Sequence, residues 1–212
     1  MNSTCGRGQK AFNMTKTIEF IFDFASPNAY LVHHALPDLI ARTGARVVYT
    51  PCLLGGIFRA TNNKAPMVQF ADIPAKMGYE RLEMMRFIAA HNITKFQMNP
   101  YFPINTLLIM RAAIVAEQDD MLDRYIDAVL SDMWEVGRNM GDPEVVAAAL
   151  NEHGFDGVKM IERTQDQSVK DRLTTNTEQA VARGAFGIPT FFVGDQMFFG
   201  KERLDQVAAA LA

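Results

Sequence analysis

The apolar positions in the first quarter of the chain follow a strand period, then a helix period, then a strand period again. A short apolar and aromatic run from Ile18 to Phe24 predicts a buried strand. Ser26 and Pro27 follow, which are a favoured N-cap residue and a favoured first helical residue. Apolar residues then recur at helical spacing until Gly44, and residues 46–50 predict a second strand. Strand, helix and strand in this order predict a βαβ unit with parallel strands.

The middle of the chain lacks strand patterns. Residues 53–101 are rich in Gly, Asn and Pro and predict loops and short helices. Helical periodicity then returns in four segments, at residues 104–117, 121–136, 142–150 and about 166–183. Residues 53–184 are therefore expected to form an all-helical block.

Strand patterns return only near the C-terminus. Residues 190–193 and 196–199 predict two strands joined by a turn at Gly194 and Asp195. Residues 203–211 predict a closing helix. The predicted fold is thus α/β, with a βαβ unit and a ββα unit separated by a large helical insertion.

Composition and charge narrow the classes of function. The 212 residues are 49% apolar and 21% charged, with a formal net charge of −3. Without a basic patch, neither a nucleic-acid nor a membrane partner is expected. The polar segment of residues 1–16 is expected to be disordered. Two distant cysteines, Cys5 and Cys52, form no disulfide framework and favour a reducing, cytoplasmic location.

The segment around Ser26 carries the first candidate chemistry. A strand delivers the Ser26 hydroxyl to the first turn of a helix, where unpaired N–H groups and the helix dipole favour an anion. The simpler interpretation, that Ser26 is only an N-cap, stays open at this point. A second candidate is the Ile188–Pro189 bond at the entry to a strand, where a cis bond would leave the Ile188 backbone free to pair with an extended ligand. The histidines lack metal-ligand partners, so no metal is expected.

Four separated motifs occur in one order along the chain, and together they resemble a known family. They are FDFASPNAYL at residues 22–31, NKAP at 63–66, GAFGIPT at 184–190 and FGKERL at 199–204. This set resembles the DsbA-like branch of the thioredoxin superfamily that contains kappa-class glutathione transferases and 2-hydroxychromene-2-carboxylate isomerases. The resemblance implies a thioredoxin fold, formed by residues 17–52 and 185–212, with the helical insertion domain at 53–184.

The resemblance also implies a glutathione site. Ser26 matches the catalytic serine, whose hydroxyl favours the thiolate of glutathione. The residues that match cofactor-binding positions are Asn63, Lys76, Ile188, Pro189, Gly200, Lys201 and Glu202. Within this set, Lys76 matches a lysine near the glutathione carboxylate. Glu202 stands where the family has an aspartate that holds the γ-glutamyl end of glutathione.

The family contains two activities that share these residues. The first is a glutathione-dependent isomerisation of the 2-hydroxychromene-2-carboxylate type, which proceeds through a transient glutathione adduct in aromatic degradation. The alternative is a kappa-like transfer of glutathione to electrophiles, and a further alternative is a non-catalytic binding protein. The partners implied are glutathione and a small aromatic or electrophilic substrate, and a homodimer is compatible with the family. Disulfide exchange is not expected, because Ser26 and Ala29 stand where oxidoreductases of this superfamily carry Cys-x-x-Cys.

Overall fold

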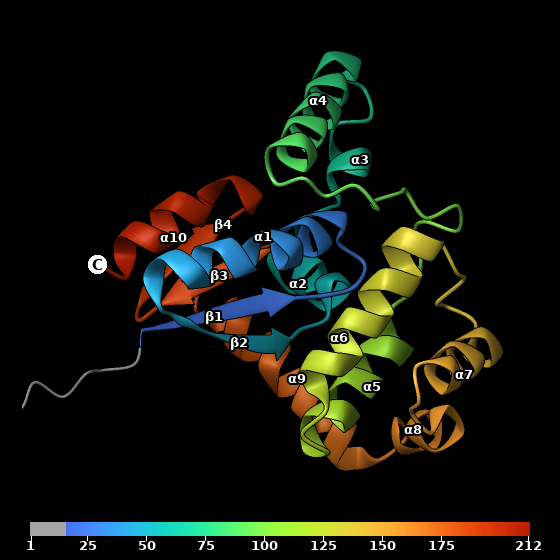
Figure 1. Cartoon of the computed structure of the whole chain (residues 1–212). Helices are drawn as coiled ribbons and strands as arrows, with labels where there is room; N and C mark the ends of the chain where they lie inside the picture. The colour runs from blue at the N-terminus through green and yellow to red at the C-terminus, as the bar shows by residue number, and fades with distance from the viewer. Residues whose placement is uncertain (1–15) are drawn as a thin grey trace, which may run out of the picture.

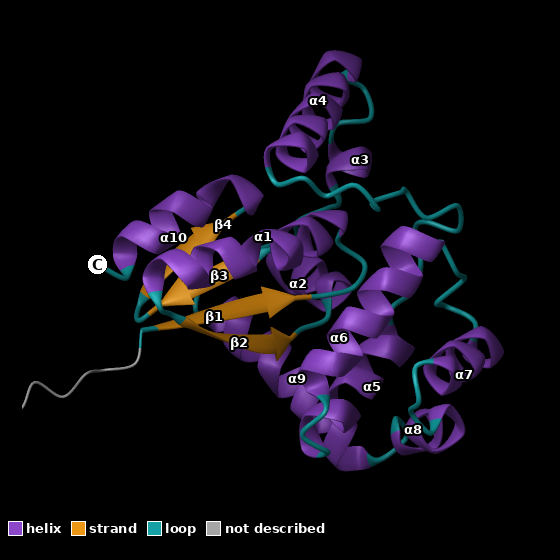
Figure 2. Ribbon diagram, in the orientation of Figure 1, coloured by secondary structure: helices purple, strands orange, loops and turns teal. Residues whose placement is uncertain are grey.

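A computed structural model describes residues 16–212, and its centre is a four-stranded mixed sheet (Figures 1 and 2). The strand order is β2-β1-β3-β4, with β1 at Thr17–Phe22, β2 at Arg46–Pro51, β3 at Thr190–Val193 and β4 at Gln196–Phe199. The β1–β2 pair is parallel, whereas β1–β3 and β3–β4 are antiparallel. The predicted βαβ and ββα units are therefore confirmed. The expectation of disorder falls on residues outside the described part of the chain, apart from Lys16.

The helix that follows β1 begins and ends as the sequence predicts. The helix α1 spans Pro27–Thr43, and the Ser26 hydroxyl accepts a hydrogen bond from the Ala29 N–H at 3.3 Å. Gly44 ends the helix in the left-handed conformation at φ 67°, which glycine adopts without strain. β1 is shorter than predicted, because the chain turns at Asp23 rather than continuing to Phe24.

The helical block follows the predicted segments closely, with one addition. It contains α5 (Leu107–Gln118), α6 (Leu122–Ser131), α7 (Pro143–Glu152), α8 (Gly157–Arg163) and α9 (Gln167–Ala182). A π-helix at Asp132–Val136 continues α6 to the predicted end. The helix α8 was not predicted, because seven residues are too few to show a helical period. The closing helix α10 spans Leu204–Ala210, after a 3₁₀ turn at Lys201–Arg203.

The segment predicted to hold loops and short helices contains one long helix, so that expectation is wrong there. α2 (Leu54–Thr61) and α3 (Pro66–Gln69) are short, but α4 spans 17 residues at Pro74–Ala90. Apolar residues occupy both sides of α4 instead of one stripe, which hides its period in the sequence. α3 and α4 form an arm, residues 66–90, that projects from the rest of the molecule in Figure 1.

The sheet and the helical block share one hydrophobic core. The buried indole of Trp134 in the block donates a hydrogen bond to the Phe24 carbonyl at 3.0 Å. Asn176 on α9 donates to the Pro51 carbonyl at 3.1 Å. These bonds attach the block at the edge of the sheet where β1 and β2 end. Among the described residues, no helix is long and apolar enough to cross a membrane.

Candidate active site

The candidate site is built around Ser26, which lies between the end of β1 and the first turn of α1. Its side chain is almost fully buried. The hydroxyl accepts from the Ala29 N–H and donates to the Ile188 carbonyl at 3.2 Å, across 162 residues of sequence. The antiparallel pairing of β1 with β3, in which Ile21 faces Thr190, accounts for this long-range contact. Ser26 is therefore both an N-cap and one side of a site that includes the segment before β3.

The Ile188–Pro189 peptide bond is cis, as the sequence predicted. Two hydrogen bonds join this segment to other predicted residues. The Gly200 N–H donates to the Pro189 carbonyl at 3.0 Å. The Asn63 amide donates to the Phe186 carbonyl at 2.8 Å, two residues before Ile188. Hydrogen bonds to the carbonyl groups of residues 186–189 thus bring together Ser26, Asn63 and Gly200 from three distant segments.

Gly200 begins the segment that the resemblance assigns to the γ-glutamyl end. Gly200 has a φ of 101°, a conformation that favours glycine, and the chain then turns into Lys201 and Glu202. Lys201 is buried, with 3% of its surface exposed, and its ammonium group pairs with the Glu202 carboxylate. Its Nζ also lies 5.7 Å from the centre of the Phe87 ring on α4. The Glu202 side chain stays 45% exposed, so a carboxylate faces outward beside Gly200.

The structure does not bring Lys76 into this cluster. Lys76 lies in the first turn of α4, and its Nζ sits 3.4 Å from the centre of the Phe70 ring. Phe87, the α4 residue that approaches Lys201, lies 11 positions later, which is about 16 Å along a helix. Lys76 therefore occupies the outer end of the arm, away from the Lys201 contact.

A buried carboxylate, Asp23, holds the turn that carries Ser26. It accepts hydrogen bonds from the Ala25 N–H at 2.9 Å, the Leu54 N–H at 2.7 Å and the Thr106 hydroxyl at 2.7 Å. Burial raises the pKa of Asp23 above its ordinary value, against the opposing effect of these three bonds. Asp23 thus ties the Ser26 turn to the start of α2 and the start of α5.

Two further residues near Ser26 extend the site along α1. Asn28, in the first turn, has a buried side-chain oxygen without a hydrogen-bond partner among the described residues. Tyr30, one turn after Ser26, is fully buried and donates to the Glu135 carboxylate at 3.1 Å. Burial is the main cause that raises the pKa of the Tyr30 phenol, so it is a proton donor at neutral pH.

Sequence reasoning singled out Ser26 and Ile188 but missed Thr106, Trp134 and Glu135. Each of these contacts α1 or the turn before it from the helical block, at separations of 83, 110 and 105 residues. A single sequence carries no local signal for such contacts. Cys52 is buried beside Asp23, and burial, with the Asp23 charge, raises the pKa of its thiol.

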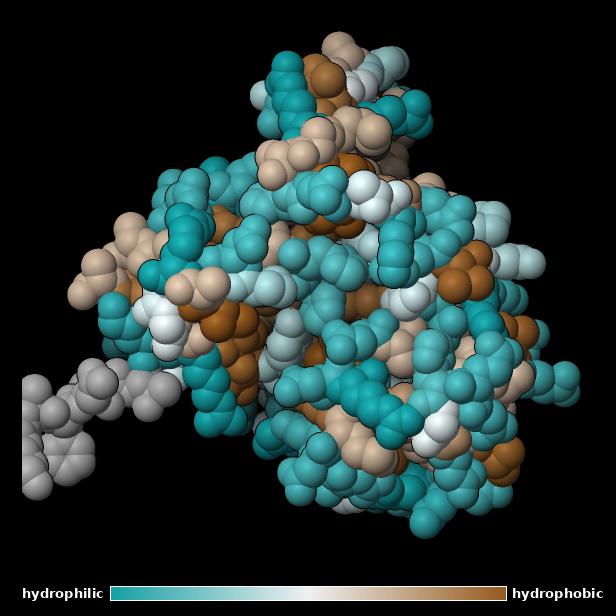
Figure 3. Space-filling model, in the orientation of Figure 1, coloured by the Kyte–Doolittle hydropathy of each residue, from teal (hydrophilic) through white to brown (hydrophobic). Residues whose placement is uncertain are grey.

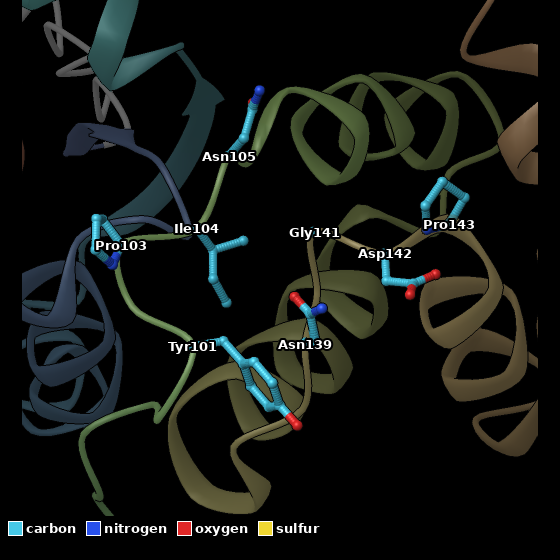
Figure 4. Close-up of a pocket in the computed structure, with 8 residues that line it drawn as sticks. All are labelled: Tyr101, Pro103, Ile104, Asn105, Asn139, Gly141, Asp142 and Pro143. Carbon is cyan, nitrogen blue, oxygen red and sulfur yellow. The ribbon is translucent and has the colours of Figure 1, made fainter.

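A separate hollow of about 500 Å³ lies between the loop at residues 101–105 and the segment at 139–143. The Tyr101, Ile104 and Asn139 side chains approach one another around it (Figure 4). It is lined by none of the predicted site residues. Asn105 lines the hollow, but the next residue, Thr106, does not. The Thr106 hydroxyl instead donates to Asp23, beside the Ser26 turn.

The fold and the Ser26 cluster define the class of protein to which this chain belongs. A model of the DSBA-like thioredoxin domain matches residues 17–212, and the chain is a member of that family. The 2-hydroxychromene-2-carboxylate isomerase of Sphingobium xenophagum is 30% identical over 91% of this chain and 96% of its own length. The human glutathione S-transferase kappa 1 is 24% identical over 93% of this chain and 92% of its own.

Solved structures agree on the fold. A structure of 2-hydroxychromene-2-carboxylate isomerase superposes with a TM-score of 0.78 at 22% identity, covering 92% of this chain and 94% of that one. A DsbA oxidoreductase structure from Streptomyces coelicolor superposes with a TM-score of 0.69 at 18% identity, covering 92% and 88%. The predicted DsbA-like thioredoxin fold and the predicted family are thereby confirmed.

Proposed function

We propose that this protein is a glutathione-dependent isomerase that acts on 2-hydroxychromene-2-carboxylate or a related aromatic ring-opening product. The observation that carries the proposal is the position of Ser26. Its hydroxyl lies at the N-terminus of α1 and faces the Ile188 carbonyl beside a cis proline. The relatives named as isomerases support the choice of reaction, because they align over nearly the whole chain. We place the activity in aromatic degradation in the cytoplasm.

The residues of this site fit glutathione as a cofactor. Asn28, two residues after Ser26, has a buried acceptor oxygen without a partner among the described residues, which suits an incoming N–H or O–H donor. The Glu202 carboxylate pairs with Lys201 but is half-exposed, so it can also contact an ammonium group of a ligand. When bound, glutathione would supply a thiolate nucleophile for reversible addition to a conjugated double bond.

The chain's own contribution is to stabilise negative charge at that sulfur. The Ser26 hydroxyl now donates to a neutral carbonyl, and it can rotate to donate to an anion instead. The N-terminus of the α1 dipole adds a favourable partial charge at the same point. The buried Asp23 and Tyr30 keep the turn and the first helical residues in place while the hydroxyl changes partner.

Titration with glutathione and an assay with 2-hydroxychromene-2-carboxylate test this proposal together. We expect saturable glutathione binding and a conversion that requires glutathione but does not consume it. A stable glutathione conjugate, detected by mass spectrometry, would instead indicate the kappa-like transferase. Absence of glutathione binding would contradict both activities and favour a non-catalytic binding protein.

A matched pair of variants assigns the binding residues. Glu202→Gln removes the outward carboxylate beside Gly200, and we expect it to weaken glutathione binding. Lys76→Gln serves as the comparison, because Lys76 lies at the outer end of the arm. Equal losses in the two variants would show that the arm reaches the cofactor, as the family resemblance implies for Lys76.

A further inference from the structure

The buried side of α1 begins with a polar residue, at the end of the helix that carries Ser26. Residues four, three and four positions apart share this side of the helix. They are Asn28, Val32, Ala35 and Leu39, of which the last three are fully buried. The exposed polar residues His34 and Asp38 lie on the outer side of α1, and the surface over this helix is largely hydrophilic in Figure 3. Asn28 is therefore a polar residue at a position where the helix pattern favours an apolar one.

The Asn28 side chain also lacks the hydrogen bond that its burial demands. Its Oδ1 atom is buried and has no partner among the described residues, a condition that only Nε of Arg111 shares in that part of the chain. Nearly all buried polar atoms in proteins are paired, so an exception beside a candidate active site points to a ligand. Asn28 as a whole is partly exposed, so rotation of the amide about its last side-chain bond can turn the oxygen outward.

Asn28 lies next to the position proposed for the glutathione sulfur. The Ser26 hydroxyl is 3.3 Å from the backbone nitrogen of Ala29, the residue that follows Asn28. In the proposed function the cofactor extends along the backbone of Ile188, whose carbonyl faces Ser26 from the other side. The second ligand must approach the same sulfur to react. The Asn28 amide is therefore within reach of that ligand, on the α1 side of the site.

We propose that Asn28 determines substrate specificity by accepting a hydrogen bond from a hydroxyl group next to the double bond that glutathione attacks. This inference rests on the proposed function and defines the substrate class. 2-Hydroxychromene-2-carboxylate carries such a hydroxyl, whereas its ionised carboxylate has no proton to donate. An electrophile without the hydroxyl would leave the amide oxygen unpaired, and a site built to bind a hydroxyl discriminates against such a ligand.

Asn28→Leu tests this role in the full-length protein. Leucine has the same branched outline but no polar atoms. We expect kcat/KM for 2-hydroxychromene-2-carboxylate to fall about 10-fold to 100-fold, the effect of one lost hydrogen bond in a buried site. Glutathione affinity, measured by calorimetry, should stay as in the wild type. The midpoint of urea unfolding should rise, because the variant no longer buries an unpaired acceptor. Asn139→Leu removes an amide from the separate hollow and is the matched control, expected to keep the wild-type kcat/KM.

An inhibitor without the hydroxyl separates hydrogen bonding from shape. 4-Oxochromene-2-carboxylate lacks the 2-hydroxyl and should inhibit the wild type and Asn28→Leu equally. Weaker inhibition of the variant, by the factor lost in kcat/KM, would show that Asn28 acts through the shape of the pocket and would overturn the proposal.

Three results in Asn28→Leu would also overturn it. An unchanged kcat/KM would show that the amide does not contact the substrate. A matching loss of glutathione affinity would assign Asn28 to the cofactor. A lower urea midpoint would give the amide a structural role. A wild type that converts no substrate would instead refute the proposed function, and this inference with it.

Discussion

The Ser26 hydroxyl makes two hydrogen bonds, one as an acceptor and one as a donor. Loss of each bond would affect a different property of the protein. As an acceptor it caps α1, and an alanine at an N-cap costs about 0.5–2 kcal/mol of stability. As a donor it now satisfies the Ile188 carbonyl, and in the proposed function it would donate to a thiolate. The two roles can be separated because only the second affects the ionisation of a bound thiol.

Ser26→Ala should therefore change the pH dependence of the bound thiol. A hydrogen bond to a charged group contributes about 1.5–3 kcal/mol, which corresponds to about one to two pKa units. Thiolate formation, followed by ultraviolet absorbance in the glutathione complex, should shift to higher pH by that amount, and turnover should fall strongly. Ser26→Thr keeps the hydroxyl and is the control. An unchanged titration in Ser26→Ala would leave Ser26 as a helix cap only.

Cys52 should be inert in the folded protein. It is fully buried, and burial, with the nearby Asp23 charge, raises the pKa of its thiol, so the reactive thiolate is scarce. In a Cys5→Ser background, alkylation of Cys52 by iodoacetamide should be slow until urea unfolds the chain. The same variant should show no disulfide reductase activity. Rapid alkylation under native conditions would contradict this burial.

Among the elements, the contact of α8 with α7 depends on one glycine. A Cβ added to Gly157 would lie 2.3 Å from the Ala147 carbonyl oxygen, which is backbone and cannot turn away. Gly157→Ala should therefore separate the two helices and destabilise the fold by about 1–3 kcal/mol, measured by urea unfolding. Gly55→Ala on α2 meets nothing within 4 Å and is the control, expected to be neutral or slightly stabilising. Equal effects would show that α8 moves freely on α7.

Asp23 joins three elements, and its ionisation should appear in the pH dependence of stability. Burial raises its pKa, so the folded protein holds this proton more tightly than the unfolded chain does. That stabilisation is present below the unfolded pKa and is lost as the pH rises through the folded pKa. Asp23→Asn cannot titrate and offers one acceptor oxygen to three donors.

The free energy of unfolding of the wild type should therefore exceed that of Asp23→Asn by the largest amount at low pH, and this difference should shrink as the pH rises. Urea unfolding of both proteins across a pH series measures the difference. Asp38→Asn, at an exposed position on α1, provides the control for the loss of a carboxylate. A gap that widens with pH would contradict the raised pKa.

Elements with one clear period were predicted well, and those without one were not. α1 has a cap, a stripe and a terminal glycine, and it begins and ends where the sequence predicts. α4 has apolar residues both on its core side and on its outer face, so no single stripe marks it. The parallel β1–β2 pair and the β3–β4 hairpin were also predicted, because a βαβ unit and a two-residue turn permit few arrangements.

At the scale of the molecule, the motifs located the centre of the site but not its surroundings. Ser26 and Ile188 belong to segments with recognisable local patterns, and the structure joins them by a hydrogen bond. Thr106 and Trp134 belong to an ordinary helical block, and only the packing of that block on the sheet brings them to Asp23 and Phe24. Packing of this kind depends on the whole chain, so a local pattern cannot predict it.

This packing predicts that the sheet and the helical block unfold together. The two parts share one core, and buried hydrogen bonds at Asp23, Phe24 and Pro51 join them. Breaking either part alone would expose apolar surface and unpaired polar groups on the other. Native-state hydrogen exchange should therefore give the slowest amides of β1 and of α5 the same free energy of opening, close to that of global unfolding. Amides of α4 serve as the internal comparison and should exchange much faster, because none of the residues of this helix is fully buried. Opening free energies for β1 and α5 that differ by more than about 1 kcal/mol would show two separately folding domains, since a two-state domain has one value.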